Sequence, residues 1–398
     1  MISCVALACG EATQQAASVP RVRPGIEVLL EDSLHLVEGA RVGIITNHTG
    51  VDRAGRSTID RLVGTESVDL VTLFDLVALF SPEHGIRGSE GAGESVESGR
   101  DSKTGLPVYS LYGSTQKPTT DMLEGLGVLL FDIQDIGSRY YTYVSTMALG
   151  MEAAGEAGIP FIVLDRPNPI GGTRVQGNVL SPEFSSFVGM YPVPMRHGMT
   201  PGELARMFVG EFGLEVELHV VPVDGWEREL SFEESGLPWI GPSPNMPTIE
   251  SATHYAGTCL FEGTNLSVAR GTDRPFQQIG APWLDGELLA GRLSAYGIPG
   301  VRFEAVTFTP DSPDDGKFDG EAVHGVRLVA LDEDYDPTLA AVAMLVEARH
   351  MSGERWRWRE SHFDRLAGTD RLRLGVEEGR TVREIREGWD TALAAFLR

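Results

Sequence analysis

Four short apolar runs in the first 170 residues each end abruptly in a cluster of polar residues. The runs cover residues 41–46, 76–80, 128–131 and 159–164, and the clusters begin at Asn47, Ser81, Asp132 and Asp165. Strands that are apolar throughout are typical of a parallel sheet with helices on both faces. Because the carboxyl ends of parallel strands share one edge, where α/β folds bind ligands, the four clusters should meet at one crevice. This arrangement favours an enzyme.

Helical patterns lie between these runs. They predict helices at residues 57–64, 119–126 and 146–157, with Ser57 as the N-cap of the first. Alternating strands and helices predict an α/β fold built on a doubly wound parallel sheet, and we assign that sheet to residues 25–190.

The pattern changes near residue 190, where we place the boundary of a second, smaller α/β domain, residues 191–398. Thr200, Pro201 and Glu203 together predict a helix start with a capping box. Strands are expected at 216–223 and near 258–262, 301–308 and 323–331, and helices near 285–296, 337–350 and 381–397. The active-site cleft is expected between the two domains.

Composition narrows the class of protein. A chain of 398 residues with 42% hydrophobic and 23% charged residues fits a folded protein of two domains. Its formal charge of −24 argues against nucleic acid as a partner, because binding to a phosphate backbone relies on basic surface.

Residues 1–24 read as a signal-like segment and linker. An apolar stretch, residues 1–10, precedes a polar one, and the residues from Val5 to Cys9 resemble a degenerate lipoprotein cleavage box. We therefore expect export to the cell envelope, periplasmic or secreted, with Cys9 as a candidate lipid anchor. No other apolar run approaches the roughly 20 residues that span a bilayer, so no transmembrane helix is expected. Cys259 has no plausible disulfide partner and should be a buried, small apolar residue.

A tandem hexapeptide, residues 69–74 and 75–80, precedes the cluster at Ser81. Six residues are a multiple of the two-residue strand period, so the repeat would leave the facing of later side chains unchanged. We interpret it as a local insertion that leaves Glu83 in place.

Signatures of nucleotide and metal sites are missing from the sequence. The glycines from Gly88 to Gly93 have the wrong spacing for a dinucleotide loop, and there is no phosphate loop. Neither a nucleophile elbow nor histidine and cysteine pairs at ligand spacing occur. We therefore expect no cofactor and no metal.

The remaining candidates are carboxylates, amides, arginines and aromatic residues, which suit a carbohydrate site. Glu83 lies between Pro82 and His84 in a turn, where desolvation would favour the protonated carboxyl that a general acid requires. A loop carboxylate that caps a backbone donor is the alternative. The catalytic candidates are Glu83, His84, Asp132 and Asp165.

Candidate substrate-binding residues come from both domains. Tyr140, Tyr141 and Tyr143 form an aromatic patch with the cluster at Asp132, although two of the three could be core residues. Asp165 and Arg166 could instead form a structural ion pair. The full candidate set is Asn47, His48, Gln134, Asp135, Arg139, Tyr141, Arg166, Asn168, Arg196, His197, Asn245, Glu262, Asn265 and Arg270.

Several of these segments resemble the signature blocks of the DUF1343 family. The blocks are residues 44–50, 79–88, 131–137, 165–172, 196–200 and 261–265, and the similarity runs from about Gly25 to the C-terminus. Characterised members are exo-acting β-N-acetylmuramidases of glycoside hydrolase family 171. The resemblance implies a Rossmann-like N-terminal domain, a smaller C-terminal domain, and Glu83 as the catalytic residue. The sequence departs from the family at Val268, where a glutamate is usual.

The resemblance implies release of a terminal, non-reducing, β-linked N-acetylmuramic acid from peptidoglycan fragments during cell-wall turnover and recycling. In this hypothesis Glu83 protonates the leaving oxygen while His84 and Asn47 hold it in position. The lactyl carboxylate would bind Arg139, Arg166 or Arg270.

The second catalytic group stays open among Asp132, Asp135, Asp165 and the acetamido group of the substrate. Carboxyl groups about 5–5.5 Å apart would indicate retention, and roughly 6.5–9.5 Å inversion. A non-catalytic binder of cell-wall fragments is the alternative function, and a cofactor-dependent oxidoreductase is disfavoured by the missing glycine fingerprint.

Overall fold

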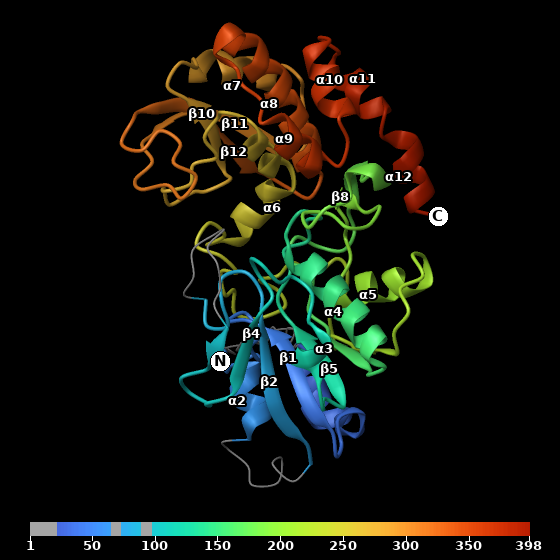
Figure 1. The fold of residues 1–398 in the computed structure, drawn as a ribbon. Coiled ribbons are helices and arrows are strands. Elements are labelled where there is room, and N and C mark those ends of the chain that lie inside the picture. Colours follow the sequence, from blue (N-terminus) through green and yellow to red (C-terminus); the bar gives the residue numbers. More distant parts are fainter. Residues whose placement is uncertain (1–21, 65–72, 89–97) are drawn as a thin grey trace, which may run out of the picture.

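The structure is a computed structural model that describes residues 22–64, 73–88 and 98–398. An N-terminal domain built on a large sheet lies below a C-terminal domain with a smaller sheet (Figure 1). The candidate lipid anchor Cys9 and most of the first hexapeptide copy lie outside the described residues.

The large sheet has seven strands in the order β3-β4-β2-β1-β5-β6-β9. Their bounds are β1 (Arg41–Thr46), β2 (Asp75–Ser81), β3 (Gly99–Arg100), β4 (Pro107–Ser110), β5 (Val128–Asp132), β6 (Phe161–Leu164) and β9 (Leu218–Val221). All neighbours pair in parallel except β3, which is antiparallel to β4. The four predicted runs are thus the adjacent strands β2, β1, β5 and β6, and their carboxyl ends face the C-terminal domain (Figure 1).

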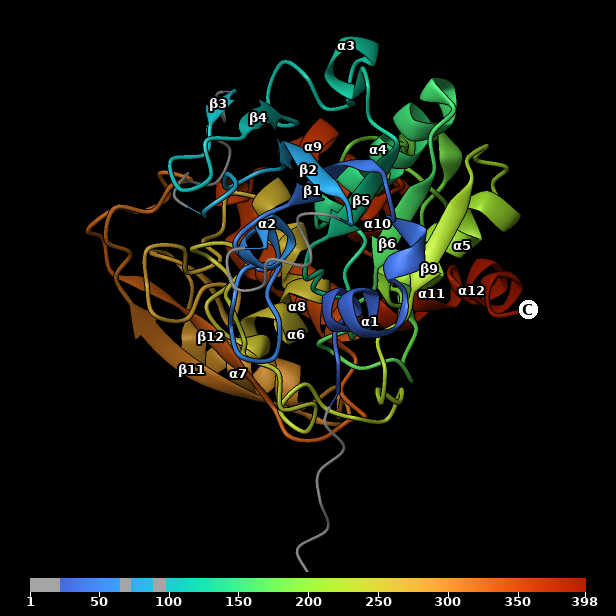
Figure 2. The same cartoon turned by 90° about the horizontal axis from the view of Figure 1, so that it is seen from below.

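Helices cover both faces of this sheet (Figure 2), as the sequence predicted. One face packs on α1 (Gly25–Asp32) and α2 (Thr58–Val63), and the other on α4 (Tyr143–Ala157) and α5 (Pro201–Gly210). Neighbouring strand residues alternate between two buried clusters: Ile44 lies in one and Ile45 in the other. Because successive strand side chains point to opposite faces, a strand buried on both faces must be apolar throughout.

The C-terminal domain is built on an antiparallel sheet, β10 (Gln278–Ala281), β12 (Val323–Ala330) and β11 (Val301–Phe308), in that order. The long helices α6 (Ile249–Thr258) and α8 (Pro337–Ser352) pack on each other. The remaining helices are α7 (Gly286–Ser294), α9 (Glu360–Ala367), α10 (Arg371–Glu377), α11 (Val382–Glu387) and α12 (Asp390–Phe396). Most of its buried hydrophobic residues belong to the same cluster as the α4 face of the large sheet, so one core joins the two domains, while Ala269, Phe308 and Val323 form a small separate cluster.

Short elements connect these layers. They are α3 (Thr120–Leu123), the hairpin β7 (Gln176–Val179) and β8 (Pro194–Arg196), and the 3-10 helices η1 (Leu34–Leu36), η3 (Pro182–Phe184), η4 (Cys259–Gly263) and η5 (Gly353–Arg355). The strand expected near 258–262 is wrong, because the 3-10 helix η4 occupies Cys259–Gly263, and the single helix expected near 381–397 is two helices. Cys259 is fully buried, as predicted.

The large sheet continues past residue 190, where the sequence placed the domain boundary. Its last strand, β9, pairs with β6, so α5 and β9 complete the first domain rather than begin the second. The capping box of Thr200 and Glu203 is present at α5, whereas Ser57 occupies the N-cap of α2 without a side-chain capping bond.

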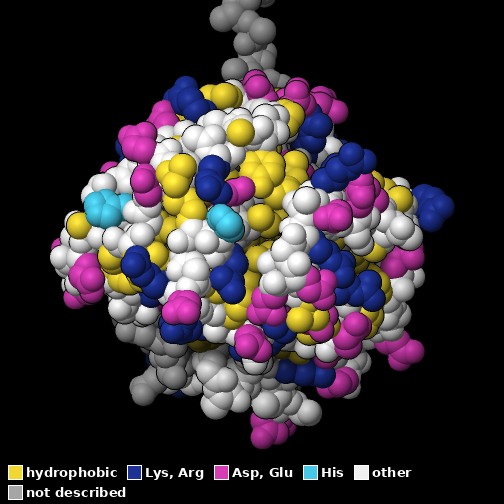
Figure 3. Space-filling view, turned by 90° about the horizontal axis from the view of Figure 1, so that it is seen from above, with side chains coloured by type: hydrophobic (Ala, Val, Ile, Leu, Met, Phe, Trp, Pro, Cys, Tyr) yellow, Lys and Arg dark blue, Asp and Glu magenta, His cyan; other side chains and the backbone are white. Residues whose placement is uncertain are grey.

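The surface seen from the C-terminal side carries acidic and basic side chains in alternation (Figure 3). Charged side chains of the C-terminal domain form exposed pairs, such as Arg292 with Glu347 and Arg383 with Glu387. Exposed pairs of this kind contribute little to stability but keep the local field mixed in a strongly acidic chain.

Candidate active site

A cleft of about 660 Å3, including its open mouth, lies between the carboxyl edge of the large sheet and the C-terminal domain. The lining residues are Glu83, His84, Tyr112, Tyr140, Tyr141, Thr142, Val188, Ser243, Asn245, Met246, Tyr255, Glu262, Arg270, Phe276, His362 and Leu366.

Glu83 enters this cleft from a tight turn after β2. The amide of Gly85 donates to the carbonyl of Pro82 at 3.3 Å, which places Glu83 and His84 at the two central positions. His84 has a φ of 70°, a left-handed conformation that costs a residue with a side chain on the order of 1–3 kcal/mol. The turn therefore stores strain at the point where it directs the carboxyl of Glu83 into the cleft.

Two hydroxyl groups from other loops lie beside this carboxyl. The hydroxyl of Thr142, at the start of α4, donates to Oε2 of Glu83 at 3.0 Å. Tyr112, which follows β4, lines the same cleft, where burial and the charge of Glu83 raise the pKa of its hydroxyl. Glu83 is thus held among hydroxyl donors that remain protonated at neutral pH.

The three tyrosines after β5 are all buried, but they differ in role. The hydroxyl of Tyr140 donates to the carbonyl of Ala256, and that of Tyr143 donates to the carbonyl of Pro242 at 2.8 Å. Tyr141 lines the cleft, and its buried hydroxyl makes no hydrogen bond of good geometry with the described residues. Its ring packs edge-on against Tyr143 and Tyr255. Tyr141 therefore forms part of the aromatic wall of the cleft.

The wall contributed by the C-terminal domain is a charged network. Arg270 binds Oε1 of Glu262 through Nε at 3.0 Å and Nη2 at 2.5 Å, and binds Asp314 through Nη1 at 2.8 Å. Burial alone would lower the pKa of Arg270, but Glu262 and Asp314 raise it instead. Asn245 donates to Asp314 at 2.7 Å and extends the network to the opposite loop.

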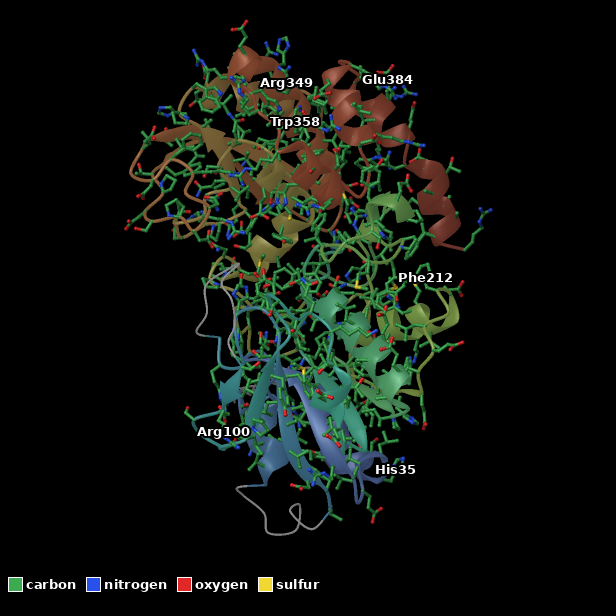
Figure 4. The ribbon with its side chains drawn as sticks, viewed as in Figure 1. His35, Arg100, Phe212, Arg349, Trp358 and Glu384 are labelled. Atoms are coloured by element: carbon green, nitrogen blue, oxygen red, sulfur yellow. The ribbon has the colours of Figure 1, made fainter. Side chains whose placement is uncertain are left out.

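Helix α9 supplies His362 and Leu366 to the same wall. Burial lowers the pKa of His362, although the nearby Glu262 acts in the opposite direction. Edge-on aromatic contacts hold this helix: the ring of Phe363 packs against Trp358, at 4.5 Å between centroids, and Trp358 packs against Trp356. Trp358 is labelled within the C-terminal domain in Figure 4, on the segment that leads into α9.

Asp132 does not line the cleft but is fully buried in an ion pair at the end of β5. Its carboxylate binds Arg166 through Nε at 2.5 Å and Nη2 at 3.0 Å, and it accepts a hydrogen bond from Thr58. Arg166 also donates to the carbonyl of Val51. The structure therefore assigns Asp132 and Arg166 to each other, rather than to a substrate.

Asp165 also points away from the cleft, toward the N-terminus of α5. It accepts hydrogen bonds from the hydroxyl of Thr200 and the amide of Gly202, both at 2.8 Å, and from the amide of Arg166. Burial raises the pKa of Asp165 to about 6 despite these donors. Asp165 therefore binds backbone amides and a hydroxyl. The ion pair between Asp165 and Arg166 that the sequence allowed is not formed, because the guanidinium of Arg166 pairs with Asp132 instead.

Neither Asn47 nor His48 lines the cleft: Asn47 binds within its own loop, and His48 contacts the loop after Glu83. Oδ1 of Asn47 accepts from the amide and the hydroxyl of Thr49. Nε2 of His48 donates to the carbonyl of Gly241 at 2.9 Å, and burial lowers the pKa of this ring. A Cβ added to Gly88 would lie 2.5 Å from the ring of His48, so the loop after Glu83 rests on this histidine.

The other predicted residues outside the cleft bind backbone groups and hold loops in place. Asp135 accepts from the amide of Gly137 at 2.7 Å, and Nε2 of His197 lies 3.5 Å from its carboxylate. Four other side chains donate to backbone carbonyls. Gln134 donates to the carbonyl of Pro167 and Asn168 to that of Met199, while Arg196 donates to that of Ile170 and Asn265 to that of Arg355. Burial lowers the pKa of Arg196 to about 10.

Arg139 is buried and donates to four backbone carbonyls. Nη1 binds those of Asn178 and Val193, and Nη2 those of Leu366 and Ala367, all at 2.8–3.0 Å. Burial lowers its pKa to about 10. With both terminal nitrogens occupied by carbonyls, Arg139 is not arranged to take the carboxylate of a ligand.

Six of the predicted site residues thus line the cleft: Glu83, His84, Tyr141, Asn245, Glu262 and Arg270. Tyr112, Thr142, Tyr255 and His362 also line it and were missed. Thr142 directly follows the predicted Tyr141 in the sequence. Tyr112 is adjacent to no predicted cluster, and Tyr255 and His362 lie on helices α6 and α9, where no local sequence pattern marks them as site residues. Val268 is fully buried in the core behind Arg270, so the departure from the family lies behind the cleft surface.

Comparisons with known proteins agree along the whole chain. The N-terminal model of the family described as "Exo-beta-N-acetylmuramidase NamZ" matches residues 42–250, and its C-terminal model matches residues 253–398. A relative named peptidoglycan β-N-acetylmuramidase NamZ, from Bacillus subtilis (strain 168), is 44% identical over 99% of this chain and 93% of its own length.

Two solved DUF1343 family structures from Bacteroides fragilis NCTC 9343 share the fold. One has a TM-score of 0.87 at 38% identity, covering 95% of this chain and 97% of its own. The other has a TM-score of 0.73 at 32% identity, and the match covers 94% of this chain and 96% of that structure's chain.

We predict that Asp132→Asn destabilises the protein by about 3–5 kcal/mol, because it leaves the buried guanidinium of Arg166 without a counter-charge. Urea unfolding followed by circular dichroism measures this change. The control is Glu387→Gln, which breaks an exposed pair with Arg383 and should stay within about 0.5 kcal/mol. An Asp132→Asn protein of wild-type stability that lacks activity would restore the catalytic role for this carboxylate.

The raised pKa of Asp165 predicts a pH dependence of stability. The folded state binds the proton more tightly than the unfolded state, whose value is near 3.8, so this group's contribution falls as pH rises from about 4 to about 6. At about 1.4 kcal/mol for each pKa unit, the total change is on the order of 3 kcal/mol. The stability of Asp165→Asn relative to wild type should therefore rise between pH 4 and 7 in urea titrations. The exposed Asp75→Asn should show no such trend, and a flat difference for Asp165→Asn contradicts the assignment.

Proposed function

The chain belongs to the exo-β-N-acetylmuramidase NamZ family, and from this premise we propose that it removes terminal β-linked N-acetylmuramic acid from the non-reducing end of peptidoglycan fragments. In this proposal, the released N-acetylmuramic acid is a product of cell-wall turnover that the cell recycles. The observation that carries it is the carboxyl of Glu83, directed by a strained turn into a cleft lined by tyrosines and a charged wall.

Glu83 is the proposed general acid. It would give its proton to the glycosidic oxygen as the bond to the anomeric carbon breaks, so that the remaining glycan leaves with a free hydroxyl. The oxygen of a water molecule would then bond to the anomeric carbon, and one proton of that water would restore the protonated Glu83. Its place in the cleft supports this role, and the hydroxyl of Thr142 holds one oxygen of the carboxyl in a fixed direction. His84 shapes the turn and lines the cleft beside it.

Arg270 is the proposed partner of the lactyl carboxylate of muramic acid. Of the three arginines considered from the sequence, it alone lines the cleft, since Arg139 and Arg166 are occupied by carbonyls and Asp132. The side chain of Asp314 is one-third exposed, at 33%, so the substrate carboxylate could replace it on Nη1. The contact would be charge-assisted, and it would exchange one carboxylate partner of Arg270 for another.

Asp132, Asp135 and Asp165 lie outside the cleft, which removes the support that sequence gave them as the second catalytic group. Among the described residues that line the cleft, Glu262 is the other carboxylate, and Arg270 binds it through two nitrogens. A carboxylate held in this way is a weak nucleophile.

We predict that Glu83→Gln lowers kcat on a chromogenic β-N-acetylmuramic acid glycoside by at least about 100-fold, because an amide cannot donate the acid proton. The variant should still bind N-acetylmuramic acid in calorimetry. The wild type should hydrolyse this glycoside in preference to the N-acetylglucosamine analogue. Binding without turnover by the wild type would favour the rival function, a non-catalytic binder of cell-wall fragments.

We further propose that the chain is exported to the cell envelope and carries a lipid at Cys9. The support is the apolar segment at residues 1–10 and the box-like residues before Cys9. In the described residues, no helix is both long and apolar enough to cross a membrane.

The test for export is fractionation of cells that express the full chain. Wild-type protein should sediment with membranes, and Cys9→Ser should move to the soluble envelope fraction, because a lipid chain supplies the membrane affinity. The matched control is Cys259→Ser, which leaves the N-terminal segment intact. Recovery of both proteins from the cytoplasmic fraction contradicts export.

A further inference from the structure

We propose that Thr142 is a positioning residue for the reaction: its hydroxyl holds one carboxyl oxygen of Glu83 and thereby fixes the direction in which the acid presents its proton. This inference rests on the proposed role of Glu83 as the general acid. During the reaction the proton moves from Glu83 to the glycosidic oxygen, and Thr142 keeps its own.

The contact joins two strand ends that are not neighbours. Glu83 follows β2 and Thr142 follows β5, and β1 lies between these strands in the sheet. The hydroxyl of Thr142 donates to Oε2 of Glu83 at 3.0 Å, and the pair is partly buried. A hydrogen bond that spans three strands of a rigid sheet sets the orientation of the carboxyl more firmly than a bond within one loop.

The position of Thr142 at the N-cap of α4 shows that this hydroxyl is diverted from its usual partner. A threonine N-cap normally accepts a hydrogen bond from an amide of the first turn. Four other helices in the described chain begin in this way, with caps at Thr119, Thr200, Thr248 and Thr381. Thr142 makes no such capping bond and has helical φ and ψ of −67° and −10°.

Only the side chain is diverted, because the backbone of Thr142 still serves the helix. Its carbonyl accepts from the amide of Thr146 at 2.9 Å, as an N-cap carbonyl should. The 15-residue helix therefore forms without its side-chain cap and leaves the hydroxyl for Glu83. If the hydroxyl served only stability, the capping geometry of the other four threonines would be expected here too.

Tyr112 completes the surroundings of the carboxyl from the other side. It lines the cleft, and the charge of Glu83 acts on its hydroxyl. Because this tyrosine lies beyond β2, on the loop after β4, Glu83 is flanked by hydroxyls from both directions along the sheet edge.

The experiment compares Thr142→Val, which keeps the shape and removes the hydroxyl, with Thr142→Ser, which keeps the hydroxyl. We expect Thr142→Val to lower kcat about 10- to 100-fold through misorientation of the acid, with KM little changed. The bond also favours the ionised carboxylate, so its loss should move the alkaline limb of the kcat/KM profile to higher pH. Thr142→Ser should restore both properties.

The matched control is Thr146→Val, one turn further along α4. Its hydroxyl is buried and donates to the carbonyl of Thr142 at 3.3 Å, so its removal perturbs the same helix without touching Glu83. The thermal unfolding temperature of Thr142→Val should be close to that of the wild type, because no capping bond is lost. Thr146→Val should leave the pH profile unchanged.

The positioning role is overturned if Thr142→Val has the wild-type kcat and pH profile. It is also overturned if Thr146→Val shows the same loss of kcat, or if Thr142→Ser fails to restore it. Full turnover by Glu83→Gln would instead contradict the proposed function of Glu83, so the two failures are distinguishable.

Discussion

The guanidinium of Arg139 is the interaction on which the geometry of the cleft depends. Two of its four acceptors are the carbonyls of Leu366 and Ala367, the last two residues of α9. Carbonyls at this end of a helix have no hydrogen-bond donor within the helix. A cation at this end also meets the negative pole of the helix. The same side chain binds the hairpin β7–β8 and lies in the loop after β5. One buried charge therefore fixes the C-terminal wall of the cleft to the edge of the large sheet.

The polar residues at the strand ends fall into two groups, an inner layer that is buried and an outer layer that faces the cleft. In the inner layer the polar groups bind one another or the backbone: Asp132 binds Arg166, Asp165 binds the N-terminus of α5, and Gln134 and Asn168 bind backbone carbonyls. Buried polar groups need such partners, because an unpaired one costs the full desolvation penalty. The outer layer consists of the turn at Glu83 and the residues at the start of α4, and these groups are left to face a ligand.

In the outer layer, three local features near the carboxyl of Glu83 lower the stability of the folded state. His84 adopts a left-handed backbone conformation, α4 lacks the side-chain cap that other threonines provide, and the hydroxyl of Tyr141 is buried without a good partner. Each feature is unfavourable by itself, and all three lie beside one carboxyl. Such strain persists only where the surrounding structure over-determines it, as the shared core of the two domains does here.

The sequence determined the parallel sheet and the edge at which polar residues gather, because continuous apolar runs, helical periodicity and helix caps are local properties. The order of the strands within the sheet was decided only by the tertiary structure. The sequence also located Glu83, since proline and glycine punctuate that turn in the sequence itself. Which polar residues pair with each other was decided only by the tertiary structure: Asp132 and Arg166 are 34 residues apart, and Arg139 meets carbonyls 227 residues away. Tyr255 and His362 reach the cleft because α6 and α9 are packed there by distant contacts, and no local pattern records such an orientation.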